Sequence, residues 1–175
     1  SMRQKRRELT PEFISSASAL IIDKIIPMIS SLKCVMLYMS AFNEPETTAL
    51  TNYLFDNNIK VVIPVSNTSD CTIIPTYISS LDELDKGAYG ICEPEIINKA
   101  DINDIDIVLV PGIAFSKQGA RIGFGKGYYD KLLESYKGTK AGICYDFQVH
   151  DEIPSSPHDI KMDMIITEKR IYNDF

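Results

Sequence analysis

The sequence predicts an α/β fold in one domain, with a mostly parallel sheet flanked by helices on both faces in three layers and a candidate antiparallel edge strand. Helical and strand-like patterns alternate along the chain, which is typical of a sheet built from βα units. A length of 175 residues and a hydrophobic content of 45% suit one compact core. Because no repeat, low-complexity tract or long linker interrupts the pattern, we expect the domain to span residues 2–175. Ser1, before Met2, resembles a remnant of recombinant expression.

The first helix is expected to begin at Thr10. The run Thr10-Pro11-Glu12 provides an N-cap hydroxyl, a proline at the first helical position and an acid in the first turn. Pro27 is expected to end or kink this helix. Its inward face is expected to consist of Ile14, Ala17, Ile21, Ile22 and Ile25.

A strand, a helix and a strand are expected next. Residues 34–39 form a short apolar run that suits a buried strand, and residues 46–56 are expected to form a helix. Residues 60–65 are the next strand. After a polar stretch, residues 71–74 are the candidate antiparallel edge strand.

The second half of the chain continues the alternation, although residues 79–86 carry no clear pattern. Apolar runs predict buried strands at 106–110 and 140–145 and a last strand at 164–167. A helix between the first two of these strands is indicated by apolar residues at helical spacing: Tyr129, Leu132, Leu133 and Tyr136. Ligands of a parallel sheet gather beyond the carboxyl ends of its strands. The polar segments that follow strands are therefore candidates for a site: Glu44, residues 112–130 and residues 146–148.

Composition limits the classes of partner. With 18 basic and 24 acidic residues the net charge is −6, which argues against a broad surface for nucleic acid. No apolar run approaches the length of a membrane span, and the N-terminal segment is basic and polar. We therefore expect a cytoplasmic protein that contacts neither nucleic acid nor membrane.

The cysteines and histidines do not suggest a metal site. Cys34, Cys71, Cys92 and Cys144 have no CxxC spacing, so reduced core residues are favoured over metal ligands. The two histidines, His150 and His158, are too few and too far apart to ligate a metal together.

A basic, glycine-rich loop is the clearest functional motif. Residues 121–130 read Arg-Ile-Gly-Phe-Gly-Lys-Gly-Tyr-Tyr-Asp. Glycines allow the backbone N–H groups to approach an anion, and the helix that follows adds its own unpaired N–H groups. This pattern predicts a phosphate-binding loop. An ordinary turn stays open as the alternative, because the spacing matches neither the Walker pattern nor the dinucleotide fingerprint. Asp130, in the first turn of the helix, either caps the helix or holds Mg²⁺ on a nucleotide.

Several runs together resemble the 5-formyltetrahydrofolate cyclo-ligase family, also called methenyltetrahydrofolate synthetases. The loop and the preceding Val110-Pro111-Gly112-Ile113-Ala114-Phe115 resemble the family signature. The other matching runs follow in the family's order across nearly the whole chain: Tyr38-Met39-Ser40 with Glu44, Lys60 to Pro64, Gly90-Ile91-Cys92-Glu93-Pro94, and Pro154 with His158-Asp159 and Asp163.

The resemblance implies an ATP-driven ring closure. In this reaction ATP phosphorylates the formyl oxygen of 5-formyltetrahydrofolate, and 5,10-methenyltetrahydrofolate, ADP and phosphate are the products. Arg121, Lys126 and Glu44 would be the catalytic residues. Mg²⁺ would be the cofactor, held by Asp130 and Asp159, and ATP would be the co-substrate. A monomer or weak homodimer is expected.

The resemblance also assigns binding residues. Those implied for ATP are Arg3, Arg7, Arg121, Gly123, Phe124, Gly125, Lys126, Gly127, Tyr128 and Tyr129. Those implied for the folate are Met39, Glu44, Phe124, Gly125, Lys126, Gly127 and Tyr128. Without the resemblance, Glu44 would be expected as an exposed acid in a loop and Tyr129 as a core residue.

The N-terminus departs from the family. Many members begin with a basic K-x-x-x-R element that reaches the nucleotide phosphates, whereas Arg6 to Glu12 resembles the stretch that follows it. Either Arg3 and Arg7 serve in its place, or this segment is a solvated basic tail. Two other functions stay open: a non-catalytic folate- or nucleotide-binding relative, and a small-metabolite kinase.

Overall fold

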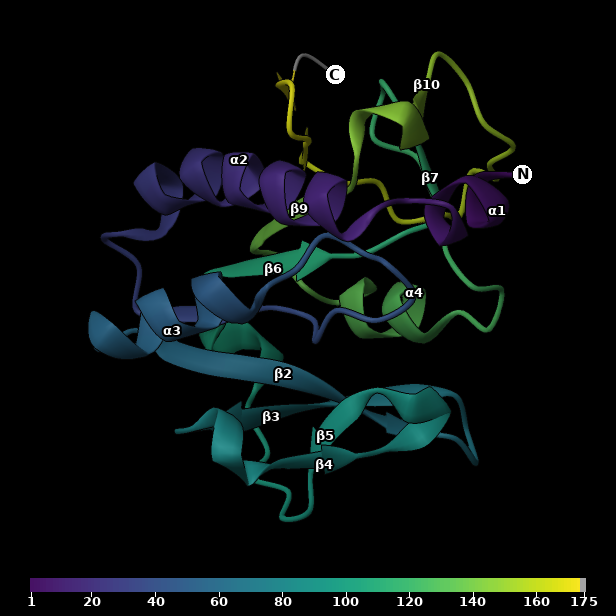
Figure 1. Cartoon of the computed structure of the whole chain (residues 1–175). Helices are drawn as coiled ribbons and strands as arrows, with labels where there is room; N and C mark the ends of the chain where they lie inside the picture. The colour runs from purple at the N-terminus through teal and green to yellow at the C-terminus, as the bar shows by residue number, and fades with distance from the viewer. Residues whose placement is uncertain (174–175) are drawn as a thin grey trace.

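The computed structural model describes residues 1–173 and has a seven-stranded sheet at its centre (Figure 1). The strand order is β12-β11-β9-β6-β1-β2-β3. Five neighbouring strands run parallel, and β3 and β12 pair antiparallel at the two edges. The strands are β1 (Cys34–Met36), β2 (Lys60–Asn67), β3 (Thr72–Ile78), β6 (Ile107–Val110), β9 (Thr139–Ile143), β11 (Met164–Ile166) and β12 (Ile171–Tyr172). The predicted mostly parallel sheet is confirmed, and an antiparallel strand lies at each edge.

Helices cover both faces of the sheet, as predicted. Successive residues of β1 point to opposite faces. Val35 packs in a core with α2 (Pro11–Ile29) and α3 (Thr48–Asp56), whereas Met36 packs in a second core with Leu133 of α4 (Tyr128–Leu133). Both cores consist of apolar side chains from the same strands, which explains why the strand sequences are apolar throughout.

Helix α2 begins where the sequence predicts. The Thr10 hydroxyl accepts a hydrogen bond from the backbone N–H of Phe13 at 3.1 Å. Pro27 does not end the helix, which continues to Ile29. Because Pro27 lies in the last turn, its missing N–H removes only the bond to the carbonyl of Asp23. Ile29 is completely buried, so the extra turn adds to the core.

Several elements differ in length from the prediction or were not predicted. Strand β1 ends at Met36, although Leu37 still donates its N–H to the carbonyl of Val62 at 3.0 Å. Strand β3 extends to Ile78, well beyond the predicted 71–74. The short elements that the sequence did not predict are α1 (Met2–Arg7), the pair β4 (Leu84–Lys86) and β5 (Cys92–Pro94), and a three-stranded sheet of β7 (Ala114–Ser116), β8 (Arg121–Ile122) and β10 (Val149–His150).

The pair β4 and β5, with the turn between them, forms an arm over residues 84–94 that packs beside β2 (Figure 1). The turn contains η2 (Ala88–Gly90), in which Tyr89 has a left-handed backbone with φ of 59°. The remaining short helices are η1 (Leu81–Glu83), η3 (Ile102–Asp104) and η4 (Asp146–Gln148).

The four cysteines are free thiols in different surroundings. Cys34 and Cys144 are buried in the sheet, as expected for core residues. Cys71 is half-buried and Cys92 is exposed, so the expectation that all four are core residues was wrong for these two. Cys71 lies in the turn between β2 and β3, and Cys92 is the first residue of β5.

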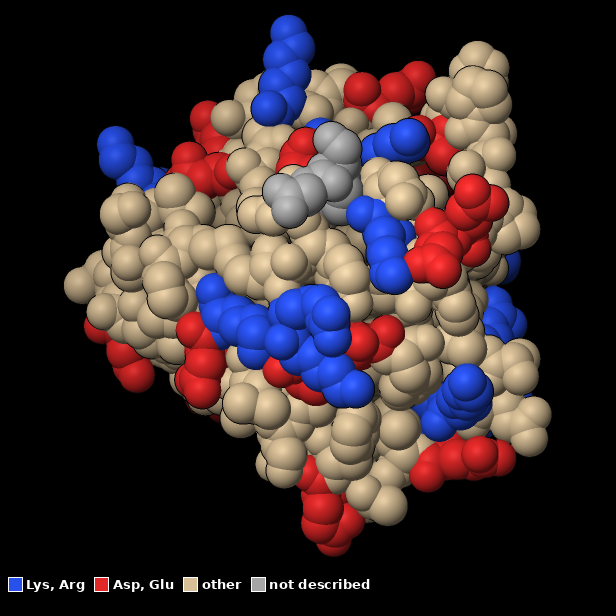
Figure 2. Space-filling model, turned by 90° about the horizontal axis from the view of Figure 1, so that it is seen from above, with Lys and Arg blue, Asp and Glu red and all other residues tan. Residues whose placement is uncertain are grey.

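The surface seen from above in Figure 1 has mixed charge. Figure 2 shows Lys and Arg side chains interspersed with Asp and Glu on this face. Within residues 1–173, the structure has no helix with the length and apolar character that a membrane span requires.

The packing of β9 against Phe115 leads to a stability prediction. A Cβ added to Gly142 would lie 2.5 Å from a ring carbon of Phe115, which is completely buried. Gly142→Ala should therefore force the ring or β9 to move and lower the free energy of unfolding by about 1–3 kcal/mol. Chemical denaturation measures the change. An unfolding midpoint equal to that of the unsubstituted protein would show that this packing is looser than the structure indicates.

Candidate active site

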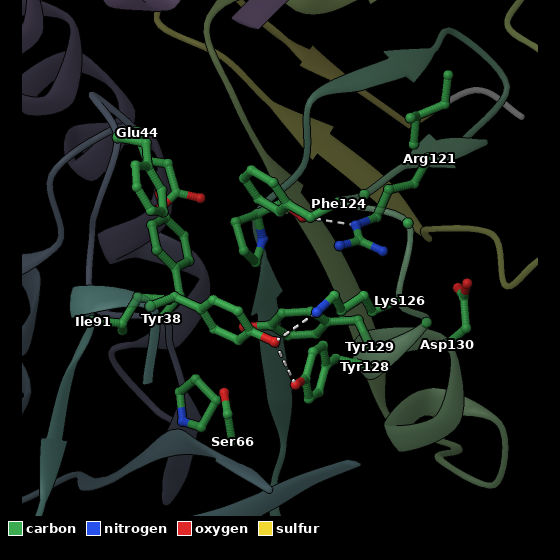
Figure 3. Close-up of a pocket in the computed structure, with 18 of the residues that line it drawn as sticks. Tyr38, Glu44, Ser66, Ile91, Arg121, Phe124, Lys126, Tyr128, Tyr129 and Asp130 are labelled. Carbon is green, nitrogen blue, oxygen red and sulfur yellow. Dashed lines mark hydrogen bonds between the residues drawn. The ribbon is translucent and has the colours of Figure 1, made fainter. Parts of the chain in front are cut away.

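A cavity of about 760 Å³ opens at the carboxyl ends of the parallel strands. All the residues that the family resemblance assigns to the site line it: Arg3, Arg7, Met39, Glu44, Arg121, Gly123, Phe124, Gly125, Lys126, Gly127, Tyr128, Tyr129, Asp130 and Asp159. Of the candidate segments that follow strands, residues 112–120 and 146–148 are not among its lining residues. Figure 3 shows Glu44 on one wall and Arg121, Lys126 and Asp130 on the opposite wall. The structure thus brings together residues that lie more than 100 positions apart in the sequence.

The glycine-rich loop has a backbone that only glycine adopts easily. Gly125 and Gly127 have φ of 93° and 71°, in the left-handed region. No heavy atom lies within 4 Å of the place where a Cβ would stand on either residue, so their backbone faces open space. Gly127 is also the N-cap of α4. Helix α4 ends at Leu133, so Tyr136 lies beyond it, contrary to the predicted helical stretch.

Arg121, in β8, is held in place by the segment that follows β6 and by Tyr129. Its Nε donates a hydrogen bond to the carbonyl oxygen of Pro111 at 2.7 Å, and its guanidinium carbon lies 5.1 Å from the ring centroid of Tyr129. Burial lowers the pKa of Arg121, but a guanidinium in a protein stays protonated. Tyr129 packs against the second core and also lines the cavity, so it has both of the roles that the sequence left open.

Lys126 lies in a cluster of hydrogen bonds with two tyrosines at the mouth of the cavity (Figure 3). Its Nζ donates to the hydroxyl of Tyr89 at 3.0 Å, and this hydroxyl lies 3.1 Å from that of Tyr128. The bond to Tyr89 raises the pKa of Lys126, which keeps the ammonium charged. The sequence analysis did not assign Tyr89 to the site, although Tyr89 immediately precedes the matched run Gly90 to Pro94.

Glu93 holds the arm that carries Tyr89. One carboxylate oxygen accepts the backbone N–H of Ser66 in β2 at 2.5 Å, and the other accepts that of Ala88 at 2.9 Å. The carboxylate comes so close to Gly87 that any Cβ there would collide with it. Glu93 is a positioning residue that the sequence analysis missed, because its partners lie 27 and 5 residues away.

Glu44 is buried, which corrects the expectation of an exposed loop acid. Phe42 and Asn43 both have left-handed backbones, with φ of 54° and 60°, and they turn the chain so that Glu44 faces inward. The side chain is 6% exposed, and its Oε1 accepts the N–H of Ala41 at 2.9 Å. Burial raises the pKa of Glu44 to about 7, against the opposite effects of Ala41 N–H, Arg6 and Arg121. A carboxyl with this pKa can hold or release a proton near neutral pH.

The basic N-terminal segment is a short helix, α1, against the cavity. Arg3 and Arg7 are exposed and line the cavity, with the Arg3 guanidinium 5.4 Å from the Phe124 ring centroid. Arg6 is only 3% exposed, and its Nη1 donates to the carbonyl oxygen of Gly112 at 3.1 Å. The sequence analysis did not assign Arg6 to the site. Arg6 and Arg7 follow Arg3 by three and four residues, so helical spacing alone does not distinguish them.

The two aspartates assigned to the metal both line the cavity. Asp130 is in the first turn of α4, and Asp159 accepts hydrogen bonds from the N–H and hydroxyl of Ser156 at 2.7 and 3.2 Å. Across residues 1–173, no group of three or more His, Cys, Asp or Glu side chains is arranged to hold a metal ion. Two carboxylates beside the glycine-rich loop nevertheless fit the chemistry of Mg²⁺, which commonly combines one or two carboxylates with phosphate oxygens and water.

Comparison with known proteins gives a consistent match. Residues 1–168 match the model of the 5-formyltetrahydrofolate cyclo-ligase family. The chain is 30% identical to a 5-formyltetrahydrofolate cyclo-ligase of Mycolicibacterium smegmatis, over 97% of this chain and 91% of the relative. It is similar to the structure of Aquifex aeolicus 5,10-methenyltetrahydrofolate synthetase, with a TM-score of 0.87, 33% identity and coverage of 98% and 88%. For the Mycoplasma pneumoniae synthetase the TM-score is 0.79, with 29% identity and coverage of 95% and 94%.

The raised pKa of Glu44 predicts how stability depends on pH. Because the folded-state pKa of about 7 exceeds the ordinary 4.5, Glu44 favours folding most below pH 4.5, and this contribution is lost as pH rises to 7. Glu44→Gln removes the titration. The variant should therefore gain stability relative to the unsubstituted protein between pH 4.5 and 8, by on the order of 3 kcal/mol. Denaturant unfolding across this range measures the difference.

The matched control is Glu46→Gln, which changes an exposed carboxyl two residues away. Its stability should follow that of the unsubstituted protein at every pH. If the free energy of unfolding of Glu44→Gln also changes with pH in parallel with that of the unsubstituted protein, the carboxyl of Glu44 ionises as freely in the folded chain as in the unfolded chain.

Proposed function

The chain belongs to the 5-formyltetrahydrofolate cyclo-ligase family, and we propose that it converts 5-formyltetrahydrofolate to 5,10-methenyltetrahydrofolate with ATP as co-substrate and Mg²⁺ as cofactor. The observation that carries the proposal is one cavity with a basic glycine loop on one wall and a buried carboxyl of raised pKa on the other. The first suits phosphate and the second suits proton transfer.

The chemistry requires both walls. An N-formyl carbon is a poor electrophile, because the nitrogen donates electrons to the carbonyl, and the formyl oxygen is a poor leaving group. Transfer of the γ-phosphoryl group of ATP to that oxygen makes the carbon more electrophilic and turns the oxygen into part of a good leaving group. N10 of the folate then attacks the carbon, the proton of N10 is removed, and the C–O bond breaks to release phosphate. Such a transfer is catalysed chiefly by positioning and by neutralisation of charge.

We assign the phosphate end of the reaction to the glycine loop. Lys126 and Arg121 supply positive charge, and the open backbone at Gly125 and Gly127 supplies N–H donors. Asp130 and Asp159 would hold Mg²⁺, which when bound neutralises charge on the nucleotide phosphates. Lys126 must exchange its hydrogen bond with Tyr89 for one with phosphate, and both partners are exposed enough to allow this.

We assign the folate end to Met39 and Glu44 on the opposite wall, together with the aromatic residues Phe124 and Tyr128 of the loop. Met39, Phe124 and Tyr128 present apolar and aromatic surface suited to a flat pterin. Phe42, whose ring lies 6.1 Å from that of Phe124, extends this surface. Glu44 would accept the proton that leaves N10, because its pKa of about 7 lets it do so near neutral pH.

The two alternative functions are less well supported. A non-catalytic relative would have no use for Lys126, Arg121 and both aspartates around one cavity. A small-metabolite kinase would leave the buried Glu44 without a role. A cytoplasmic location and a monomeric or weakly dimeric state stay predictions.

The proposed reaction predicts an absorbing product whose formation depends on both ATP and Mg²⁺. With 5-formyltetrahydrofolate, ATP and Mg²⁺, the protein should form the methenyl chromophore and release one ADP per product. Absorbance and coupled ADP assays measure the two rates. Full-rate ring closure without nucleotide would contradict the role of ATP, and an unchanged rate with a chelator would contradict the role of the metal.

Two substitutions should distinguish the residue that acts on the phosphates from the residue that acts on the folate. Lys126→Met should lower the turnover by about a hundredfold or more, because it removes charge matched to the phosphoryl oxygens, and should leave folate binding nearly intact. Glu44→Gln should impair ring closure or folate binding and spare nucleotide binding. Calorimetric titration with each ligand and steady-state kinetics measure these effects.

Lys131→Met is the matched control for the lysine. Lys131 lies five residues after Lys126 and does not line the cavity. Its Nζ donates hydrogen bonds to the backbone carbonyls of Asp70 and Cys71. Its turnover should stay within threefold of that of the unsubstituted protein. If Lys126→Met and Glu44→Gln lose affinity for the same ligand, the division of roles between the two walls is wrong.

A further inference from the structure

Arg6 is a buried guanidinium with an incomplete set of partners. It is 3% exposed and lines the cavity, and among residues 1–173 its side chain makes one hydrogen bond, from Nη1 to the carbonyl of Gly112. Its Nε is buried and has no hydrogen-bond partner among residues 1–173. An arginine presents five N–H donors, so most of the donor capacity of Arg6 is unused.

The charge of Arg6 is also not neutralised by an ion pair. In the described part of the chain, the carboxylates that pair with lysine or arginine within 4.0 Å are Asp146, Asp151 and Asp163, and Arg6 is not among their partners. Burying an unpaired charge is unfavourable unless something compensates for it. An anionic group in the cavity would supply the missing partner.

Arg6 lies between the residues assigned to the folate and those assigned to the phosphates. Its backbone carbonyl accepts a hydrogen bond from the Asn43 side chain at 2.9 Å, next to Glu44, and its guanidinium carbon lies 6.0 Å from the ring centroid of Phe124 in the glycine loop. Arg6 therefore stands between the carboxyl assigned to the folate and the loop assigned to the phosphates. Arg3 and Arg7 also line the cavity but differ from Arg6 because both are exposed to solvent.

We propose that Arg6 is a catalytic residue that binds the phosphoryl group while it is on the formyl oxygen of the folate. This inference rests on the proposed function. The bond between the γ-phosphorus and the bridging oxygen of ADP breaks as the bond from phosphorus to the formyl oxygen forms. Arg6 donates N–H groups to the phosphoryl oxygens of the resulting intermediate.

The same contact serves the second half of the reaction. When N10 attacks the formyl carbon and loses its proton to Glu44, the C–O bond breaks and its electron pair leaves with inorganic phosphate. Negative charge therefore stays on the phosphoryl oxygens through both steps, next to donors that are already in place. Arg3 and Arg7 would not replace Arg6, since neither is buried at the junction of the two walls.

The test compares Arg6→Met and Arg6→Lys with Lys5→Met, a control that removes an exposed cation of the same helix outside the cavity. The fold tolerates loss of the guanidinium, because Gln148 Nε2 also donates to the Gly112 carbonyl at 3.0 Å and the bond from Asn43 goes to backbone. Circular dichroism and thermal unfolding confirm folding of each variant. The turnover is measured at saturating substrates, and affinities for Mg-ADP and for the folate are measured by calorimetry.

Arg6→Met is expected to lose about a hundredfold or more in kcat and to keep both affinities within threefold, because the contact exists only once the phosphoryl group has moved. Arg6→Lys should retain part of the rate through its charge. A kcat of Arg6→Met within threefold of Lys5→Met overturns the proposal. A loss of Mg-ADP affinity as large as the loss in rate also overturns it, because Arg6 would then bind nucleotide.

Failure of the proposed function would look different. If the unsubstituted protein forms no methenyl product, inorganic phosphate serves as the probe of Arg6. Weaker phosphate binding by Arg6→Met than by Lys5→Met would support an anion site at Arg6, and equal binding would overturn it. If Arg6→Met does not fold, the same comparisons with Arg6→Lys decide between these outcomes.

Discussion

Burial of the central strands on both faces is the constraint on which the rest of the structure depends. In β6 (Ile107–Val110) every side chain is packed, with Ile107 and Leu109 in one core and Val108 and Val110 in the other. No polar group can be placed along such a strand without loss of stability. The chain therefore carries its functional groups where the strands end, and the parallel order brings these ends to one edge. The cavity is a consequence of how the core is built.

Electrostatic balance in this cavity follows from the same burial. Glu44 is removed from water, and Arg6 and Arg121 are close enough to affect its pKa without forming an ion pair with it. The carboxyl therefore keeps a pKa of about 7, which a close ion pair would lower. On the opposite wall the hydrogen bond to Tyr89 raises the pKa of Lys126, whose ammonium is charged at neutral pH. The two walls thus present a group that can exchange protons and a group that cannot.

The sequence predicts the parts of the fold whose signal is local. The long helix α2 and the central strands carry apolar patterns, and the glycine loop has its motif in ten consecutive residues. Elements of two or three residues, such as β8 (Arg121–Ile122), are too short to show a period. The burial of Glu44 depends on left-handed backbones at Phe42 and Asn43, and a turn at these positions could not be predicted because neither residue is a glycine. Arg6 looks like its basic neighbours in the sequence, and only the orientation of a six-residue helix distinguishes it.

The arm at residues 84–94 contains a convenient site for a spectroscopic label. Cys92 begins β5 and is the exposed thiol among the four, whereas burial raises the pKa of Cys34 to about 11 and raises that of Cys144 well above its ordinary value. A thiol-reactive dye should therefore prefer Cys92, and a Cys71→Ser background would remove the half-buried competitor. Because Glu93, the next residue, ties this arm to β2, a dye at Cys92 would report fluorescence changes when the wall that carries Tyr89 moves. A label at this position therefore requires no introduced cysteine.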